Sequence, residues 1–113
     1  MMYSLFIGRF QPLHAGHVAL IRKVLDEGRP VLVALRDTIR SDANPYSLGE
    51  RTAQFYREFL PELQHGQLRL MTIPDIEEVC HGRKVGWGIR EIRLDDATEA
   101  ISATAIRAEQ SIA

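Results

Sequence analysis

Two short apolar runs, separated by a helical pattern, dominate the first third of the chain. Residues 3–7 predict a buried strand that ends at Gly8, and residues 30–35 form the continuous apolar run typical of a strand covered on both faces. Between them, residues 18–25 follow a helical pattern, and Gly28 comes just after as a helix-ending residue. A strand, a helix and a strand this close together form a right-handed βαβ unit. The sequence therefore predicts a parallel sheet.

The rest of the chain continues the alternation of strands and helices. Ser47 and Glu50 form a Ser-x-x-Glu capping box, so a second helix should begin there and stop near Pro61. Three further elements are expected, namely strands at 68–73 and 89–94 and a last helix that opens within 101–107. We therefore expect an α/β fold, a small Rossmann-like open parallel sheet with helices on both faces, in one domain that spans residues 1–113.

Composition and charge narrow the class of function. The formal net charge of −1 gives no basic surface for nucleic acids or membranes. Cys80 is the only cysteine, so no internal disulfide can form, which fits a reducing cytosol. The sequence has no signal-peptide pattern and no apolar run long enough to span a bilayer. We expect a cytoplasmic protein that binds neither nucleic acids nor membranes, and a homo-oligomer, because such a small sheet leaves apolar edges to cover.

The stretch from Gly8 to His17 is the first candidate site. His14 and His17 are three residues apart, so they lie side by side if they begin a helix. A helix start offers free backbone N–H groups and the positive end of a dipole, which suit a phosphate group. Ligands of open α/β sheets bind outside the carboxyl ends of the strands, and Gly8, without a Cβ, would let a phosphate approach the backbone. A chance pair of surface or capping histidines is the alternative, and the position directly after a strand favours the phosphate site.

Residues 101–107 form the second candidate site. Ser102 and Thr104 at a helix start can donate hydrogen bonds to phosphate oxygens, and Arg107 follows about one turn later. On its own this pattern is that of a helix cap followed by a surface arginine. Together with the histidine motif near the other end of the chain, it favours two halves of one triphosphate site.

With both motifs, the chain resembles the nucleotidylyltransferase superfamily. Its members carry His-x-Gly-His near the start and Ile-Ser-x-Thr-x-x-Arg near the end, matched here by residues 14–17 and 101–107. Within the superfamily the chain is most similar to archaeal-type nicotinamide-mononucleotide adenylyltransferases. Their Gly-Arg-Phe-Gln-Pro, Asn/Asp-Pro-Phe/Tyr-Ser/Thr-x-Gly-Glu-Arg and Ile-Pro-Asp-Ile stretches match residues 8–12, 44–51 and 73–76.

The resemblance implies an enzyme that transfers an adenylyl group from ATP to a small phosphomonoester such as NMN, releasing pyrophosphate. It gives catalytic roles to His14, His17 and Arg107, and it implies Mg²⁺ bound to the triphosphate, with no metal ligands assigned to protein side chains. The residues it implies for nucleotide binding are Gly8, Arg9, Phe10, Gly16, Ile101, Ser102 and Thr104. The candidates for acceptor binding are Gln11, Arg36, Asp37 and Trp87.

The chain departs from this family after residue 76. Only residues 77–100 separate the third matched stretch from the serine motif, where the relatives have a much longer section with another strand and helix. Trp87 comes later than the tryptophan that stacks on the nicotinamide ring in the relatives, so it either stacks on a substrate ring or covers the core. Ala43 stands where a basic residue is usual, and Arg36 or Arg40 could substitute for it.

Two other functions remain open at this point. One is a cytidylyltransferase that uses CTP and a phosphorylated alcohol, although such enzymes usually have Gly-Thr-Phe-Asp where this chain has Gly-Arg-Phe-Gln at residues 8–11. The other is a catalytically idle nucleotide-binding module, or a piece that works only beside a partner protein. A zinc site is not expected, because His65, His81 and Cys80 lack the spacing of zinc ligands.

Overall fold

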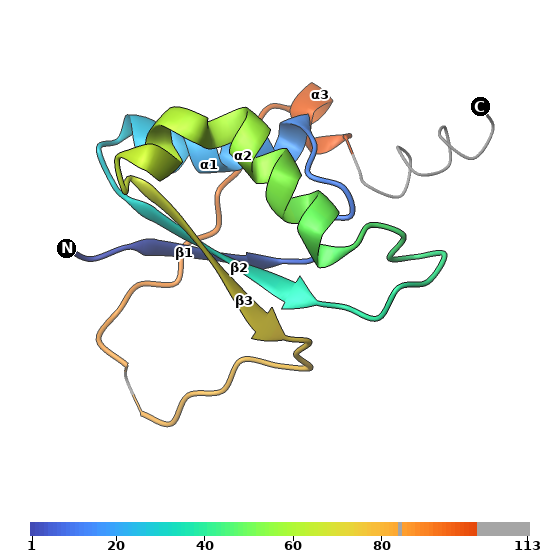
Figure 1. Cartoon of the computed structure of the whole chain (residues 1–113). Helices are drawn as coiled ribbons and strands as arrows, with labels where there is room; N and C mark the ends of the chain where they lie inside the picture. Colours follow the sequence, from blue (N-terminus) through green and yellow to red (C-terminus); the bar gives the residue numbers. More distant parts are fainter. Residues whose placement is uncertain (84, 102–113) are drawn as a thin grey trace.

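A computed structural model describes residues 1–83 and 85–101. The elements follow in the order β1 (Ser4–Gly8), α1 (Ala15–Asp26), β2 (Val31–Asp37), α2 (Leu48–Gln64), β3 (Leu68–Pro74) and the single turn α3 (Asp96–Glu99) (Figure 1). The three strands form one parallel sheet in the order β1-β2-β3. Phe6, Val33 and Leu70 are partners across it. The predicted βαβ unit is confirmed, and a second one follows directly from it.

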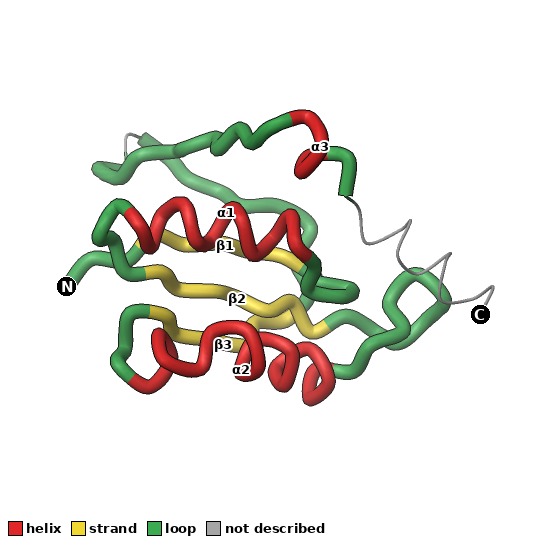
Figure 2. The backbone as a smooth tube through the Cα atoms, turned by 90° about the horizontal axis from the view of Figure 1, so that it is seen from above, coloured by secondary structure: helices red, strands yellow, loops and turns green. Residues whose placement is uncertain are grey.

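Both long helices lie on the same face of the sheet. Figures 1 and 2 show α1 and α2 on one side of the three strands. The strand order explains this arrangement, because two right-handed crossovers that step across a sheet in the same direction place their helices on the same face. The expectation of helices on both faces is therefore not met by the helices of the described residues.

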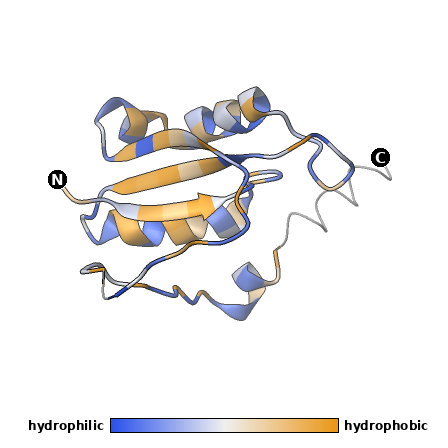
Figure 3. Ribbon diagram, turned by 90° about the horizontal axis from the view of Figure 1, so that it is seen from below, coloured by the Kyte–Doolittle hydropathy of each residue, from blue (hydrophilic) through white to orange (hydrophobic). Residues whose placement is uncertain are grey.

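The hydrophobic core fills the space between the helices and this face. Val31, Val33 and Leu35 of β2 belong to one core cluster with apolar side chains of both helices. The helix residues in the core are Ile21, Val24, Phe55 and Phe59. On the opposite face of the sheet, apolar side chains of the two outer strands are exposed to water. Leu5 of β1 is 54% exposed, and Ile7 of β1 and Met71 of β3 are also exposed. Figure 3 views this face and shows the apolar strands uncovered along much of their length.

The helix ends follow the sequence closely, with one exception. The capping box is present at α2, where Ser47 Oγ accepts from Glu50 N and Glu50 Oε1 accepts from Ser47 N, both at 3.1 Å. Gly28 adopts φ +81° just after α1, as expected of a residue that ends a helix. The second helix does not stop near Pro61, however. It bends at Phe59, where φ is −127°, and Pro61 lies in the first turn of the continued piece, where its missing N–H costs no hydrogen bond.

The predicted fourth strand at 89–94 is wrong. This segment is irregular and Ile89 is 87% exposed. Charge pairing with the first helix holds the segment instead, because Arg90 makes two hydrogen bonds of 2.7 and 2.5 Å to the Glu27 carboxylate. Asp95, just after this segment, is the N-cap of α3. None of the helices in the described part of the chain is long and apolar enough to cross a membrane.

Candidate active site

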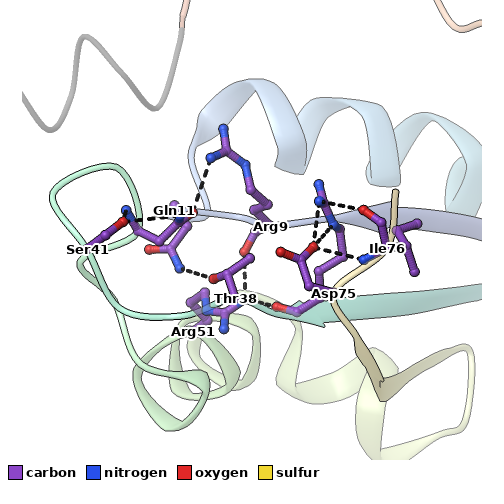
Figure 4. A network of polar contacts seen from close by, with 9 residues as sticks. Arg9, Gln11, Thr38, Ser41, Arg51, Asp75 and Ile76 are labelled. Atoms are coloured by element: carbon purple, nitrogen blue, oxygen red, sulfur yellow. Dashed lines mark hydrogen bonds and ion pairs between the residues drawn. The ribbon is translucent and has the colours of Figure 1, made fainter. Parts of the chain in front are cut away.

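The loops that follow the three strands meet at one edge of the sheet, because the strands are parallel (Figure 4). Two arginines connect these loops. Arg9, after β1, donates to Asn44 Oδ1 at 3.1 Å, which ties the first loop to the second. Arg36, at the end of β2, donates to Asp75 Oδ1 at 2.8 Å, which ties the second strand to the residues after β3. The predicted site therefore lies at the edge expected of an open α/β sheet.

His14 and His17 form a stacked pair at the start of α1. His14 is the N-cap residue, and its Nδ1 accepts from the backbone N–H of Gly16 at 3.0 Å and of His17 at 3.4 Å. His17 Nδ1 in turn accepts from the backbone N–H of His14 at 3.3 Å. The two ring centroids are 3.7 Å apart with an interplanar angle of 18°. The pair is thus a capping box built from two imidazoles.

These hydrogen bonds determine the tautomer of both rings. A neutral imidazole carries one N–H and one acceptor nitrogen, and here the Nδ1 atom of each ring is the acceptor. The proton of each neutral ring therefore lies on Nε2. The backbone of the first helical turn thus leaves two Nε2–H groups as the donors of the stacked pair.

Burial keeps both rings neutral at pH 7. Burial, together with the smaller effect of the nearby His14, lowers the pKa of His17 from 6.5 to about 4. Burial also lowers the pKa of His14, although a backbone hydrogen bond partly opposes this shift. The pair can therefore stabilise developing negative charge by hydrogen bonding, whereas positive charge at this edge comes from residues such as the exposed Arg9.

Two glycines make room for aromatic rings. A Cβ on Gly16 would lie 2.9 Å from His14 Cε1, so only glycine allows the His14 ring to cap the helix in this way. A Cβ on Gly8 would lie 3.0 Å from Cε2 of Phe10. The space beside Gly8, expected from the sequence to admit a phosphate, is thus occupied by the ring of Phe10.

Phe10 and Gln11 support the site from inside the protein. Phe10 adopts φ +52°, and its buried ring contacts His17 edge-on at 4.8 Å and Phe55 at 5.1 Å. Gln11 is 1% exposed, and its amide group donates to Tyr46 O at 3.0 Å and accepts from Tyr46 N at 2.9 Å. Neither side chain is on the surface, so the structure places them behind the site, where the sequence suggested contacts with nucleotide and acceptor.

The remaining predicted residues are dispersed. Arg36 is engaged with Asp75, and Asp37 is exposed at the end of β2. Trp87 is 66% exposed, so it does not cover the core. Ile101 is the last described residue, and Ser102, Thr104 and Arg107 lie outside the described residues. Within the described part of the chain, no group of three His, Cys, Asp or Glu side chains could hold a metal ion.

Sequence reasoning missed Arg51, which is wholly buried beneath the site. Its guanidinium donates to the backbone carbonyl oxygens of Arg9 at 2.8 Å and Arg36 at 2.7 Å. Gln54 was missed as well, and its Oε1 accepts from Leu13 N at 3.0 Å. Both residues look like polar positions on an amphipathic helix, and only the matched stretch at 44–51 drew attention to the first of them.

The chain is similar to several known proteins. The cytidylyltransferase-like family matches residues 5–58. A nicotinamide-nucleotide adenylyltransferase from Thermococcus sibiricus is 32% identical over 78 residues, which are 66% of this chain and 42% of that protein. A nicotinamide/nicotinic acid mononucleotide adenylyltransferase from Acinetobacter baylyi is 34% identical over 76 residues, or 66% of this chain and 40% of that protein. The chain thus spans less than half the length of these curated relatives.

A solved structure is similar in three dimensions. It is a bifunctional NMN adenylyltransferase/ADP-ribose pyrophosphatase from Francisella tularensis in complex with AMP and a manganese ion. The match has a TM-score of 0.55 and 26% sequence identity, and it covers 66% of this chain and 23% of that one. The small Rossmann-like α/β fold, the histidine pair after β1 and these relatives all point to the same family. The chain resembles the nucleotidylyltransferase superfamily and is similar to the archaeal-type nicotinamide-nucleotide adenylyltransferases.

Proposed function

We propose that this chain transfers an adenylyl group from ATP to an NMN-like phosphomonoester and releases pyrophosphate. The observation that carries the proposal is the pair of stacked imidazoles in the loop after β1, whose Nδ1 atoms accept from the backbone and leave Nε2–H of each ring as a donor. Because the chain spans less than half of its relatives, the activity is proposed for this chain and not transferred from them.

The chemistry is a single displacement at phosphorus. A phosphate oxygen of the acceptor attacks the α-phosphorus of ATP, the bond between the α-phosphorus and its bridging oxygen breaks, and the electron pair leaves with pyrophosphate. Both reactants are anions, so the protein contributes positioning and charge stabilisation and forms no covalent intermediate. Neutral donors suit this task, since they bind the phosphate oxygens without losing a proton to them.

Each proposed residue has a distinct part in this reaction. His14 and His17 donate from Nε2 to oxygens of the α- and β-phosphates as negative charge develops. Arg9 belongs to the same loop after β1, and its guanidinium reaches Asn44 in the second loop, so it can bridge phosphate and acceptor. From the sequence motif alone, Ser102, Thr104 and Arg107 would hold the β- and γ-phosphates, and the backbone at Gly8, Gly16 and Ile101 would lie against the nucleotide.

Mg²⁺ would enter with the triphosphate. The described residues offer no cluster of three acidic or histidine ligands, and triphosphate oxygens with water are the ligands that this ion prefers. When bound, the ion would screen the negative charge of the leaving pyrophosphate. We assign it no protein ligand.

The acceptor would lie near the second and third loops. Asp37 is exposed there, whereas Arg36 would have to leave Asp75 before it could bind an acceptor phosphate. Asp37 is therefore the better candidate at this edge. Trp87 has an exposed indole, but Arg90, three residues later, pairs with Glu27 at the end of α1 away from the histidine pair. Gln11 would contribute by holding the second loop through Tyr46.

The test is pyrophosphate release from ATP with NMN and other phosphomonoesters, with CTP in a parallel series. We expect turnover with ATP and an NMN-like acceptor, and a loss of about 10²–10³-fold in His17→Ala, the usual cost of one such donor. Arg29→Lys, an exposed change next to Glu27, serves as the control. ATP binding without turnover on any acceptor would instead favour the idle module, and turnover with CTP the cytidylyltransferase.

We also propose that the chain is cytoplasmic, binds no nucleic acid and self-associates. The exposed apolar side chains on the helix-free face, Leu5, Ile7 and Met71, support self-association. Light scattering coupled to size exclusion measures the mass directly. A monomer mass at all concentrations would remove self-association and leave the proposed reaction unaffected.

A further inference from the structure

Arg51 has an unusual environment for an arginine. Its side chain is wholly buried, and its N–H groups donate to three backbone carbonyl oxygens. Figure 4 shows Arg51 together with Arg9, one of the residues whose carbonyl it contacts. Nη1 lies 2.8 Å from Arg9 O and 2.7 Å from Arg36 O, and Nε lies 3.3 Å from Ser47 O. These carbonyls belong to the loop after β1, the end of β2 and the start of α2. One guanidinium therefore connects three segments that meet at the candidate site.

A buried cation of this kind is costly to keep. Burial lowers the pKa of the Arg51 guanidinium, and the negative charge of Asp37 only partly opposes this. Among the described residues, no carboxylate forms an ion pair with Arg51 within 4.0 Å. An apolar side chain of the same volume would avoid this cost, but it would leave the carbonyl oxygens of Arg9 and Arg36 without the donor that joins them. What the arginine adds is therefore a fixed position of the loop after β1 against the end of β2.

A short chain of contacts leads from Arg51 to the histidine pair. Arg51 holds the carbonyl of Arg9, and the next residue, Phe10, has the positive φ of +52° that this loop requires. The Phe10 ring then lies edge-on against His17 at 4.8 Å and is backed by Phe55 at 5.1 Å. A shift of the Arg9 carbonyl would therefore move the surface on which His17 rests.

We propose that Arg51 is a positioning residue: by holding the Arg9 carbonyl against that of Arg36, it fixes Phe10 and thereby keeps the His17 ring in its stack with His14. Its effect on reaction rate rests on the proposed function. Its effect on His17 itself does not, because that contact chain exists without any substrate.

The state of His17 reports this role directly. Two influences lower the pKa of His17 to about 4: burial, to which Phe10 contributes, and the facing His14, which is the titratable group acting on it. If Phe10 moves away, water reaches the ring and the pKa of His17 rises towards 6.5. A change that only weakens packing elsewhere leaves this pKa where it is.

The experiment compares Arg51→Lys with the matched control Arg22→Lys. Arg22 also joins two elements, since it pairs with Glu62, donates to Glu58 O at 3.1 Å and lies 4.6 Å over the Phe59 ring, but it touches no part of the loop after β1. The imidazole signals of both variants and of the native chain are titrated by NMR. Initial rates give kcat and KM for ATP separately.

In Arg51→Lys we expect the pKa of His17 to rise by at least one unit and kcat to fall about 10- to 100-fold, the usual cost of a misplacement of about 1 Å, with KM changed much less. Arg22→Lys should move neither quantity. A His17 pKa that stays near 4 in Arg51→Lys, with kcat equal to that of the control, would overturn the proposal. The pKa of His17 could rise in Arg51→Lys while the native chain turns over no acceptor. That result would retain the positioning role of Arg51 and reject the proposed function.

A second variant covers the case in which the lysine does not fold. Arg51→Met fills a similar volume without burying a charge, the kind of replacement that often keeps a fold intact. It should raise the pKa of His17 in the same direction as the lysine. A folded Arg51→Met protein with an unchanged His17 titration would equally refute the inference.

Discussion

Replacing Gly16 by alanine should separate the stability of this chain from its activity. The added Cβ would lie 2.9 Å from Cε1 of His14, a contact that real Cβ atoms essentially never make, and 3.1 Å from its Nδ1, which is also tight. The His14 ring must therefore rotate away. Its hydrogen bonds from Gly16 N and His17 N are lost, and so is the stack that aligns the two Nε2–H donors.

The two effects on stability nearly cancel. Losing the N-cap costs about 0.5–2 kcal/mol, whereas alanine in place of glycine in a helix gains up to about 1 kcal/mol. The free energy of unfolding should thus change by no more than about 1 kcal/mol, or roughly 4–8 °C in Tm for a small domain. Catalysis has no such compensation, and misdirecting one donor should lower turnover about 10²–10³-fold, roughly 3–4 kcal/mol.

Gly49→Ala is the matched control. Gly49 is the second residue of α2, as Gly16 is of α1, but its Cβ would meet nothing closer than Ser47 Oγ at 3.9 Å. It should stabilise the chain slightly and leave turnover unchanged. Thermal melting by circular dichroism and pyrophosphate release on the same samples give both quantities. If Gly16→Ala keeps the turnover of the control, the stacked histidines are not the donors and the reasoning fails.

Three further predictions follow from the same geometry. His14→Asn keeps a good capping side chain but removes the Nε2–H donor, so melting should change little while turnover falls about 10²–10³-fold; equal losses of both would argue against it. Folding lowers the pKa of His17 from 6.5 to about 4, so the unfolded chain binds the proton first as pH falls. Neutral His17 therefore contributes to the free energy of unfolding in full above pH 6.5, and this contribution is lost as the pH falls from 6.5 to 4. The loss is at most about 3 kcal/mol, and solvent that reaches the ring makes it smaller. Urea midpoints at pH 7 and 4.5 measure it, and His17→Gln should flatten the difference. Finally, EDTA should abolish turnover without changing the melting of the chain free of ATP, because the described residues provide no metal cluster; a lowered melting temperature would reveal a structural metal.

Local patterns in this sequence predict local structure well. The capping box at Ser47, the glycine after α1 and the three apolar runs each depend on neighbouring residues, and each appears in the structure. The strand predicted at 89–94 does not form, because a strand requires a partner strand to pair with. Arg90 of this segment pairs with the Glu27 carboxylate instead. The prediction of helices on both faces of the sheet is not met by the described helices. The order of the strands decides on which face a crossover helix lies, and strand order cannot be read from neighbouring residues.

The sequence predicted the histidine pair at the helix start, but not the buried residues that pack behind it. His14 and His17 are three residues apart in sequence, so their pairing at a helix start could be inferred from spacing alone. The positions of Phe10 and Gln11 depend on contacts with Phe55 and Tyr46, more than thirty residues away, and so a family motif suggested surface contacts where the structure has buried ones. Arg51 was missed for the same reason.

The neutrality of the histidine pair has a consequence for ionic strength. Uncharged donors act only at contact, whereas arginines attract an anion over roughly a Debye length of 8–10 Å in ordinary buffers. Capture of the nucleotide would therefore depend on cations such as Arg9, and stabilisation of the transition state on the imidazoles. Added salt should then raise KM for ATP and leave kcat nearly constant. In the proposed reaction, the first turn of α1 would thus give a catalytic contact that salt does not weaken.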